Sequence, residues 1–500
     1  MTTTTTTRRR PWSCCAGVGV LILLLATAQA KPSPSDYTTE ARTIIDSLLP
    51  GGSCAGQAWD KLAALTDTVG NRVCGSPNLN RAVSYVLDAW TKEGLENVHG
   101  EEVMVPHWQR GHEECIMLTP RLDYKMPILG LGTSVGTPNG QPVEAEVIVV
   151  KDFDELGALG QAGKIAGKIV LVNYACDWAA SPIGCYGACG QYRGEGASRA
   201  AAQGAVAYLV RSLASSSIGS PHTGMQSYLP DVTPVRIPAA AVTIEDADAL
   251  ARMQERGQNI TLRLTMECVN LPMEGSMNVI AEWKGTEKPE EVVIVSGHLD
   301  SWDVGVGAMD DGGGLAISWQ ALSVLRSLGM RAKRTVRVVG WVGEEFGGFG
   351  GKAYFERHKE EEERVVMVVE SDMGVFRPNG MSFSGGEKAG GVMKEVMSLL
   401  KPINASMLIT DDGRGYETDT GPWEAVGVPG ASLSSQNEKY FDFHHSWGDQ
   451  MGVLKKEDTD LAAAVFAVVA FVVADLDEAL PRGREGGREG EVKSEMLRRV

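Results

Sequence analysis

Apolar residues recur at spacings of three and four between residues 37 and 93, in three runs separated by Ser or Gly. This periodicity predicts three amphipathic helices. Segments rich in strand-forming residues follow at 96–108 and 114–120 and predict two strands. Near the other end, residues 461–474 form an apolar run that is too short to span a bilayer, so it predicts a buried C-terminal helix.

The pattern changes between residues 127 and 270. Short strand-like segments here are separated by Gly-rich turns, with one helix-like stretch at 195–204. This texture predicts a separate β-rich or α/β module of 127–270. The module has no cluster of His and acidic residues, so we assign it no chemistry.

From residue 271 to 480 the chain alternates between strand-like and helix-like segments. Strands that are apolar throughout need cover on both faces, which is typical of parallel sheets. We therefore predict an α/β fold with a mostly parallel central sheet and helices on both faces. The predicted strands are 278–285, 291–300, 333–345 and 363–374, and the predicted helices are 314–329 and 391–401.

Ionisable residues stand at the ends of three of these predicted strands. The pairs are His298 with Asp300, Glu344 with Glu345, and Glu370 with Asp372. In open α/β sheets, ligands bind beyond the carboxyl ends of the strands, so these side chains should converge.

A second histidine pair, His444 and His445, and the acidic turn Asp310–Asp311 add to this set. Histidine with several carboxylates and no nearby cysteine is a ligand set for zinc or a similar divalent ion. More carboxylates than one ion needs indicate two ions that share a bridge. Taken alone, the Asp turn is more typical of a helix cap than of a metal ligand, but the coincidence of these groups at several strand ends favours metal.

Composition restricts the class of protein. The chain has 500 residues, 43% of them hydrophobic and 22% charged, which is globular and long enough for more than one domain. The formal net charge of -17 argues against a nucleic-acid partner, because phosphate binding needs a basic surface.

The N-terminus has the three parts of a secretory signal: Arg8–Arg10, a short apolar run, and small residues at Ala28–Ala30. We therefore predict a cleaved signal peptide at 1–30 and a secreted or lysosomal protein, with the ER and Golgi also open. The alternative is an N-terminal membrane anchor, although the run is short for a span of ~20 residues. Residues 481–500 are Gly-rich and charged, which predicts a disordered tail.

Seven cysteines remain after the predicted signal, and some of them should pair in an oxidising compartment. Cys176, Cys185 and Cys189 are spaced too loosely for a zinc knuckle, so we expect a local disulfide among them. Asn259 and Asn404 each begin an N-x-S/T sequon and are predicted glycosylation sites.

Five motifs, in order and at matching spacing, resemble the M28 family of co-catalytic zinc peptidases: "GHLDSWDVGVGAMDDGGG", "GEEFGGFG", "ESDMG", "TDTGPWEAVGVPGASL" and "FHHSWGD". The resemblance covers nearly the whole chain from 31 to 480. It implies a peptidase domain made of 31–126 and 271–480, interrupted by a protease-associated-type insert at 127–270. It also implies two Zn²⁺ ions per chain, short peptide substrates and a homodimer.

The resemblance also implies roles for single residues. His298, Asp310 and Asp372 resemble the ligands of one zinc, while Asp310, Glu345 and His445 resemble those of the other. Glu344 then resembles the general base that moves a proton from water to the leaving amine. Asp300 resembles the carboxylate that orients His298. Of the two neighbouring histidines we choose His445, because the motif places the ligand four residues before Asp449.

These observations predict a dizinc exopeptidase for short peptides, in particular dipeptides, of the carboxypeptidase or dipeptidase type. An aminopeptidase of the same family has the same metal site and stays open. A non-catalytic binding module on this fold would lose metal ligands, whereas all five are present here. Acyl transfer such as glutaminyl cyclisation, on a related scaffold with one zinc, is a third alternative.

Overall fold

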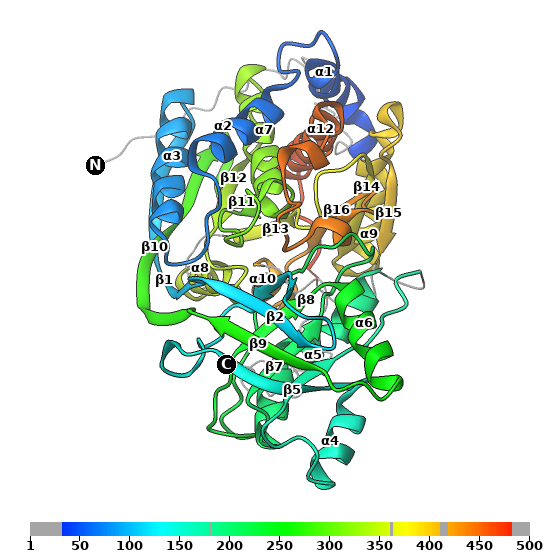
Figure 1. Cartoon of the computed structure of the whole chain (residues 1–500). Helices are drawn as coiled ribbons and strands as arrows, with labels where there is room; N and C mark the ends of the chain where they lie inside the picture. Colours follow the sequence, from blue (N-terminus) through cyan, green and yellow to red (C-terminus); the bar gives the residue numbers. More distant parts are fainter. Residues whose placement is uncertain (1–32, 180–181, 361–363, 411–418, 483–500) are drawn as a thin grey trace, which may run out of the picture.

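The computed structural model describes residues 33–179, 182–360, 364–410 and 419–482. The predicted signal peptide at 1–30 and almost all of the predicted tail at 481–500 lie outside the described residues. Within them the chain forms two eight-stranded sheets, one above the other in Figure 1.

The first sheet is the centre of an α/β domain, as predicted. Its four central strands β12, β11, β13 and β16 run parallel, and antiparallel pairs occur toward both edges. In spatial order, the strands are β1 (Glu96–Gln109), β10 (Val269–Trp283), β12 (Arg334–Trp341), β11 (Lys288–His298), β13 (Arg364–Glu370), β16 (Gly430–Ser435), β14 (Pro378–Ser384) and β15 (Met407–Thr410).

Helices cover both faces of this sheet because its central strands are apolar on both sides. Every residue of β12 is buried, and so is β11 from Val292 to its end. One face carries α1 (Thr38–Leu48), α2 (Gln57–Val69), α3 (Pro77–Glu93), α7 (Gly313–Ser327), α9 (Gly386–Ser398) and α12 (Lys456–Asp475). The other carries α8 (Phe349–His358) and α10 (Gly421–Ala425), where Trp341, Tyr354 and Trp423 form a second apolar cluster.

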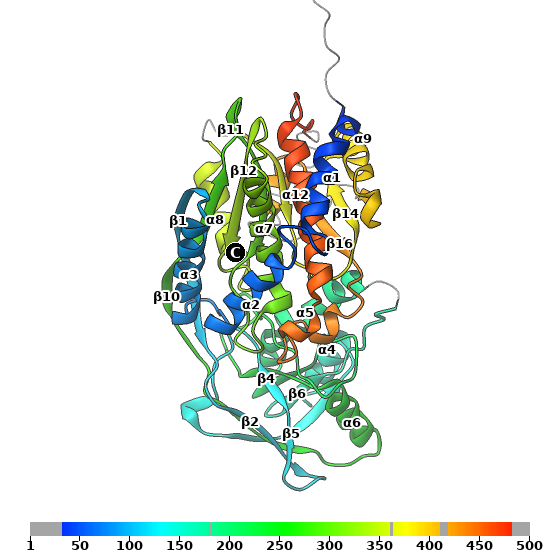
Figure 2. The ribbon, with the colours of Figure 1, turned by 90° about the horizontal axis from the view of Figure 1, so that it is seen from above.

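The predicted N-terminal and C-terminal helices are confirmed. Helices α1, α2 and α3 occupy the three periodic runs, and α12 contains the apolar run 461–474. Helix α12 is buried from Asp458 to Ala474, since it lies between α1, α7 and the sheet (Figure 2). A helix that is apolar all round must be covered in this way. Among the described residues, no helix combines the length and the apolar character needed to cross a membrane.

The second sheet is built from strands that lie between Glu113 and Met266. Its spatial order is β3 (Tyr124–Met126), β2 (Glu113–Thr119), β9 (Thr261–Met266), β5 (Val143–Val150), β6 (Ile169–Val172), β7 (Ala207–Arg211), β8 (Ala239–Val242) and β4 (Ile128–Gly130). Helices α4 (Phe153–Gln161), α5 (Pro182–Ala202) and α6 (Ile244–Glu255) accompany it. The antiparallel strands β1 and β10 lead into and out of it, and β2 and β3 join it before residue 127. The domain division at 127 and 270 stays a prediction.

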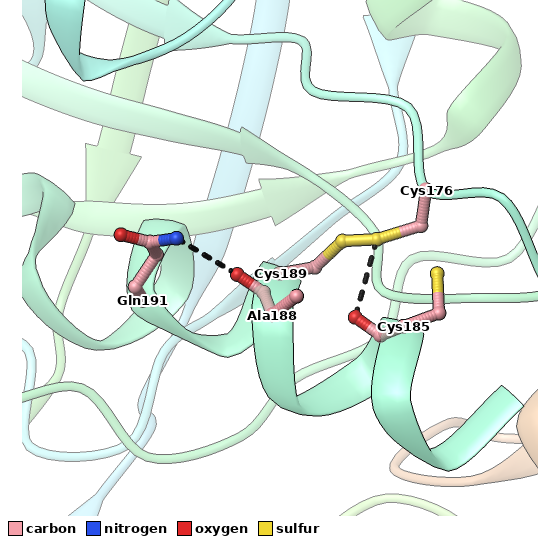
Figure 3. The surroundings of a disulfide bond; sticks show 5 residues. All are labelled: Cys176, Cys185, Ala188, Cys189 and Gln191. Carbon is pink, nitrogen blue, oxygen red and sulfur yellow. Dashed lines mark hydrogen bonds between the residues drawn. A yellow bond between two sulfur atoms is a disulfide. The ribbon is translucent and has the colours of Figure 1, made fainter. Parts of the chain in front are cut away.

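The expected local disulfide is present between Cys176 and Cys189 (Figure 3). Cys185, one turn before Cys189 on α5, keeps a free thiol. The bridged segment also packs on the first domain, because the rings of Trp178 and Tyr186 lie 5.1 and 4.9 Å from that of Phe441. The disulfide therefore closes a segment that makes aromatic contacts with the part of the chain that follows β16.

Candidate metal centre

The four central parallel strands each lead into a part of one site. Strand β11 ends at His298, β12 is followed by Glu344 and Glu345, and β13 is followed by Asp372. His445 comes after β16 and the short helix α11 (Tyr440–Phe443). Because parallel strands present their carboxyl ends at one edge, residues far apart in sequence meet there.

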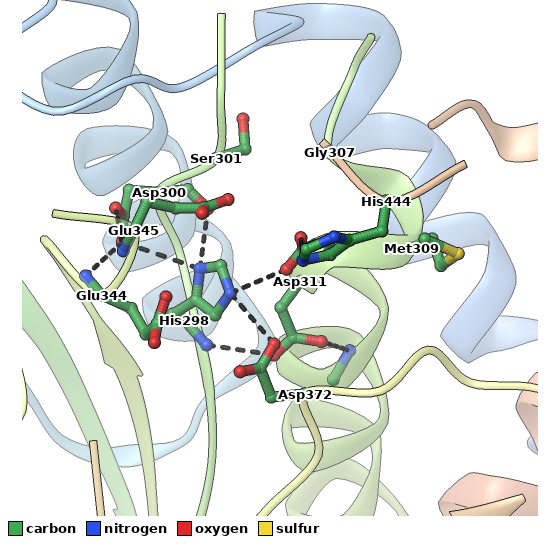
Figure 4. A network of polar contacts seen from close by, with 12 residues as sticks. His298, Asp300, Ser301, Gly307, Met309, Asp311, Glu344, Glu345, Asp372 and His444 are labelled. Carbon is green, nitrogen blue, oxygen red and sulfur yellow. Dashed lines mark hydrogen bonds and ion pairs between the residues drawn. The ribbon is translucent and has the colours of Figure 1, made fainter. Parts of the chain in front are cut away.

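Two groups of side chains share the carboxylate of Asp310. Nε2 of His298 lies 3.1 Å from Oδ1 of Asp310. It also lies 3.2 Å from Oδ1 of Asp372, and Figure 4 shows this second contact. Nε2 of His445 lies 3.3 Å from Oδ2 of Asp310 and 3.0 Å from Oε2 of Glu345. Asp310 thus presents one oxygen to each group.

His444 also reaches this centre. Its Nε2 lies 3.4 Å from Oδ2 of Asp310, and its ring stacks on His445 with centroids 3.5 Å apart. His445 in addition contacts Glu345, whereas the His444 ring packs against Tyr186 and Tyr440, at 5.0 and 4.9 Å. His445 therefore contacts a second carboxylate of the site, and it stays the predicted ligand.

Both His298 and His445 direct Nδ1 at a backbone carbonyl. Nδ1 of His298 lies 3.0 Å from the carbonyl oxygen of Asp300, and Nδ1 of His445 lies 3.3 Å from that of Thr223. A carbonyl only accepts, so each Nδ1 donates a hydrogen and Nε2 is the nitrogen of each ring that faces the carboxylates and could bind a metal.

The carboxylate of Asp300 has a task besides its predicted role toward His298. It lies 3.7 Å from Nδ1 of His298, but it accepts backbone N–H hydrogen bonds from Gly343 at 2.8 Å, Glu344 at 3.2 Å and Glu345 at 3.4 Å. Asp300 therefore orients His298 through its own carbonyl, and its side chain holds the turn that carries both glutamates.

Two aspartates to which the sequence analysis gave no role of their own hold backbone N–H groups around Asp310. Asp449 accepts the backbone N–H groups of Met309 and Asp310 at 2.7 and 3.2 Å. Asp311, next to the bridge, instead accepts those of His298 and Gly314, at 3.1 and 3.0 Å. Two sequence signals could have pointed to them. Asp449 stands at a fixed spacing from the histidine pair, and Asp311 directly follows Asp310.

Arg72 was also missed, and no sequence signal pointed to it. Its side chain is completely buried, and it donates to four carbonyls, those of Gly70, Leu299, Val306 and Gly307. The last three belong to the loop between His298 and Asp310. A buried guanidinium that donates four hydrogen bonds in this way fixes the loop in one conformation.

Crowded charges shift the pKa values of the site residues. Burial, and then the Asp310 carboxylate, raise the pKa of Glu345 to about 7. Burial alone would lower the pKa of His298, but Asp372 and the other carboxylates raise it well above the usual range. Burial, followed by the charge of Asp372, raises the pKa of Glu344 well above normal. The raised pKa values mean that these side chains hold protons more tightly than usual. A divalent cation bound at the same place would supply the positive charge instead.

The donor set fits such cations. Within the described residues, Oδ2 of Asp310 and Oε1 of Glu345 are buried and make no hydrogen bond. Buried carboxylate oxygens are costly in that state, and a bound cation would satisfy them. The ligand types, imidazole and carboxylate, match zinc.

Comparison with known proteins agrees with this geometry. The profile of "Peptidase family M28" matches residues 278–472. Carboxypeptidase Q of Bos taurus is 48% identical over 91% of this chain and 93% of its own length, and that of Homo sapiens is 48% identical over 88% and 90%. The chain belongs to peptidase family M28.

Solved structures extend the likeness to the whole fold. A peptidase M28 precursor from Shewanella amazonensis has a TM-score of 0.83 and 30% identity, over 91% of this chain and all of that one. An aminopeptidase from Aneurinibacillus sp. strain AM-1 shares the fold, with a TM-score of 0.61 at 19% identity, over 89% and 98% of the two chains. Membership of family M28 makes the protein a metallopeptidase and indicates zinc as its metal.

Proposed function

We propose that this chain is an exopeptidase that uses two zinc ions to hydrolyse short peptides, in particular dipeptides with both termini free. One observation carries the proposal: two ligand groups, each with one histidine and one further carboxylate, meet at the two oxygens of Asp310. Two ions ~3.5–4 Å apart need a shared anion, and a carboxylate supplies one.

His298, Asp310 and Asp372 would hold one ion, and Asp310, Glu345 and His445 the other. Bound zinc would supply Lewis-acid activation of a water molecule and of the scissile carbonyl. The chain keeps the ligands in place through the hydrogen bonds of Asp300, Asp449 and Arg72 described above. Since these supports are already formed, little reorganisation is needed when substrate binds.

Glu344 is the proposed general base. The Asp300 carboxylate accepts the backbone N–H groups of Glu344 and Glu345, and Glu344 is only partly buried. It takes a proton from the attacking water and delivers it to the amine of the departing residue. A positioned base of this kind contributes typically 10²–10⁴-fold, as an order of magnitude.

The proposed recognition of the substrate carboxylate rests on donors just before His445. Ser434 lies on β16, Lys439 is exposed, and Tyr440 is buried with its hydroxyl donating to the carbonyl of Asp372 at 3.3 Å. The carboxypeptidase Q relatives support this choice of substrate end by their name. A site that pairs its donors with the substrate carboxylate discriminates strongly against a substrate that lacks this group.

Hydrolysis of one dipeptide beside its N-acetylated and C-amidated forms tests the proposal. We expect the C-amidated form to react slower by roughly 10² or more. Equal rates for the free and amidated forms, with a strong loss on N-acetylation alone, would make the protein an aminopeptidase. No hydrolysis of any form by zinc-loaded protein would favour a binding module or acyl-transfer chemistry.

We further propose a secreted or lysosomal location and a homodimer. The predicted signal peptide supports the location. Asn259 and Asn404, the predicted glycosylation sites, are both exposed, which glycosylation requires. The homodimer rests on the family resemblance.

A further inference from the structure

A loop of the second sheet's module contacts His445 of the metal centre through Thr223. Thr223 lies between β7 and β8 and is 1% exposed. Its N–H donates to the carbonyl of His445 at 2.9 Å, and its own carbonyl lies 3.3 Å from Nδ1 of the same histidine. One residue of the second sheet thus holds both the backbone and the ring of His445.

His445 needs such support because of its backbone conformation. Its φ is +59°, in the left-handed region that non-glycine residues seldom adopt. A residue stays there only when its surroundings hold it. The carbonyl of Thr223 also selects the tautomer of His445 that leaves Nε2 free toward Asp310 and Glu345.

Thr223 is itself held by Arg110, at the junction of β1 and β2. The Thr223 hydroxyl donates to the carbonyl of Gly130 at 2.7 Å, and Arg110 donates to the same carbonyl at 2.6 Å. Nη2 of Arg110 also lies 3.5 Å from the Thr223 hydroxyl. The guanidinium then binds both oxygens of Asp303, at 2.8 and 2.6 Å. Asp303 belongs to the loop between His298 and Asp310, so Arg110 ties the second sheet to that loop.

The two histidines therefore differ in what positions them. His298 uses the carbonyl of a residue two places away, within its own loop, whereas His445 uses a carbonyl 222 residues distant. We propose that Thr223 and Arg110 are positioning residues for the metal subsite of Asp310, Glu345 and His445, which the second sheet thereby completes. The inference rests on the proposed two-zinc function.

Zinc titration of metal-free protein against a competing chelator tests this inference. The titration should show two binding phases, one for each subsite. The phase that His445→Ala weakens or removes is the one that belongs to the subsite of His445. Thr223→Val keeps the backbone but loses the hydroxyl, and should weaken that phase alone by roughly tenfold, the low end for a partner behind a ligand. Thr223→Ser keeps the hydroxyl and should bind like wild type. At saturating zinc the kcat of Thr223→Val should return toward wild type.

Arg110→Gln should weaken the His445 phase further. Arg263→Gln is its matched control, since Arg263 pairs with Glu144 at 2.5 Å on the exposed side of the second sheet. Unfolding of the metal-free Thr223→Val protein at the wild-type temperature would show that the fold is intact.

Wild-type affinity in both phases of Thr223→Val, or equal weakening of both, overturns the positioning role. If the wild-type protein binds only one zinc ion, the two-ion proposal is contradicted instead. The affinity of Thr223→Val for that one ion then tests the positioning role. If His445→Ala does not weaken the binding of that single ion, both proposals are wrong.

Discussion

Neighbouring residues of one type take different tasks in this site, and their contacts decide which. Asp310 presents its oxygens to the two histidines. Asp311 instead accepts the backbone N–H groups of His298, at the end of β11, and of Gly314, at the start of α7. Glu345 reaches His445, while the side chain of its neighbour Glu344 stays partly accessible. Adjacent side chains diverge because the turn that carries them is held rigidly by Asp300.

Glu344→Gln should therefore separate catalysis from metal binding. The variant cannot accept a proton, so we expect kcat to fall by at least ~10², while the zinc content stays as in wild type. Glu345→Gln is the contrast, because it removes a ligand and should lose zinc as well. Elemental analysis and steady-state kinetics measure both. Near-normal turnover in Glu344→Gln would remove this residue from the mechanism.

At the scale of elements, α2, α3 and α7 meet around one buried cation. Nζ of Lys61 on α2 lies 3.2 Å from Glu93 on α3 and 4.6 Å from the centre of the Trp319 ring on α7. Burial outweighs the attraction of Glu93 and lowers the pKa of Lys61 to about 8. This part of the helix packing therefore depends on pH.

The sign of that dependence follows from the direction of the shift. The unfolded chain holds the Lys61 proton more tightly, so stability should rise as pH increases from about 8 toward the ordinary lysine pKa near 10.4. Lys61→Met lacks this titration. Its stability relative to wild type should fall by up to about 3 kcal/mol between pH 7 and 10, measured by denaturant unfolding at saturating zinc.

Lys456→Met is the matched control for this prediction. Lys456 also pairs with an acid on α2, Asp60, at 3.0 Å, but both side chains are exposed. The difference between this variant and wild type should stay nearly constant over the same pH range. A constant difference for Lys61→Met as well would show that Lys61 is not held in a desolvated state.

On the scale of the whole molecule, side-chain and backbone contacts join the second sheet to the first sheet. The aromatic contacts of Trp178 and Tyr186 on Phe441, together with the hydrogen bonds of Thr223 and Arg110, join them beside the metal centre. The whole chain has a formal net charge of -17. Its exposed sequons are compatible with passage through the secretory pathway.

Expression in a eukaryotic secretory host tests that passage. We expect a mature N-terminus at or after Lys31 and glycan on Asn259 or Asn404, both detectable by mass spectrometry of the intact protein before and after glycosidase treatment. Asn259→Gln with Asn404→Gln should abolish the glycosidase shift. An intact Met1 with unmodified asparagines would contradict the secretory prediction.

The sequence by itself determined the elements and the types of ligand. Its hydrophobic periodicity is local information, so α1, α2, α3, α12 and the apolar strands could be predicted from it. Acidic residues and histidine at strand ends marked the edge where ligands bind, because parallel strands converge there. The assignment of single roles to His298, Asp310, Glu345, Asp372 and His445 came from the resemblance.

Only the tertiary structure decided which groups support those ligands. That Asp300 holds the glutamate turn, that Arg72 fixes the loop before Asp310, and that Thr223 holds His445 all depend on contacts between distant segments. Such contacts leave no periodic pattern, since backbone carbonyls and N–H groups are the same in every residue. Their partners are set by how the strands align and how the second sheet packs on the first, and this requires the whole folded chain.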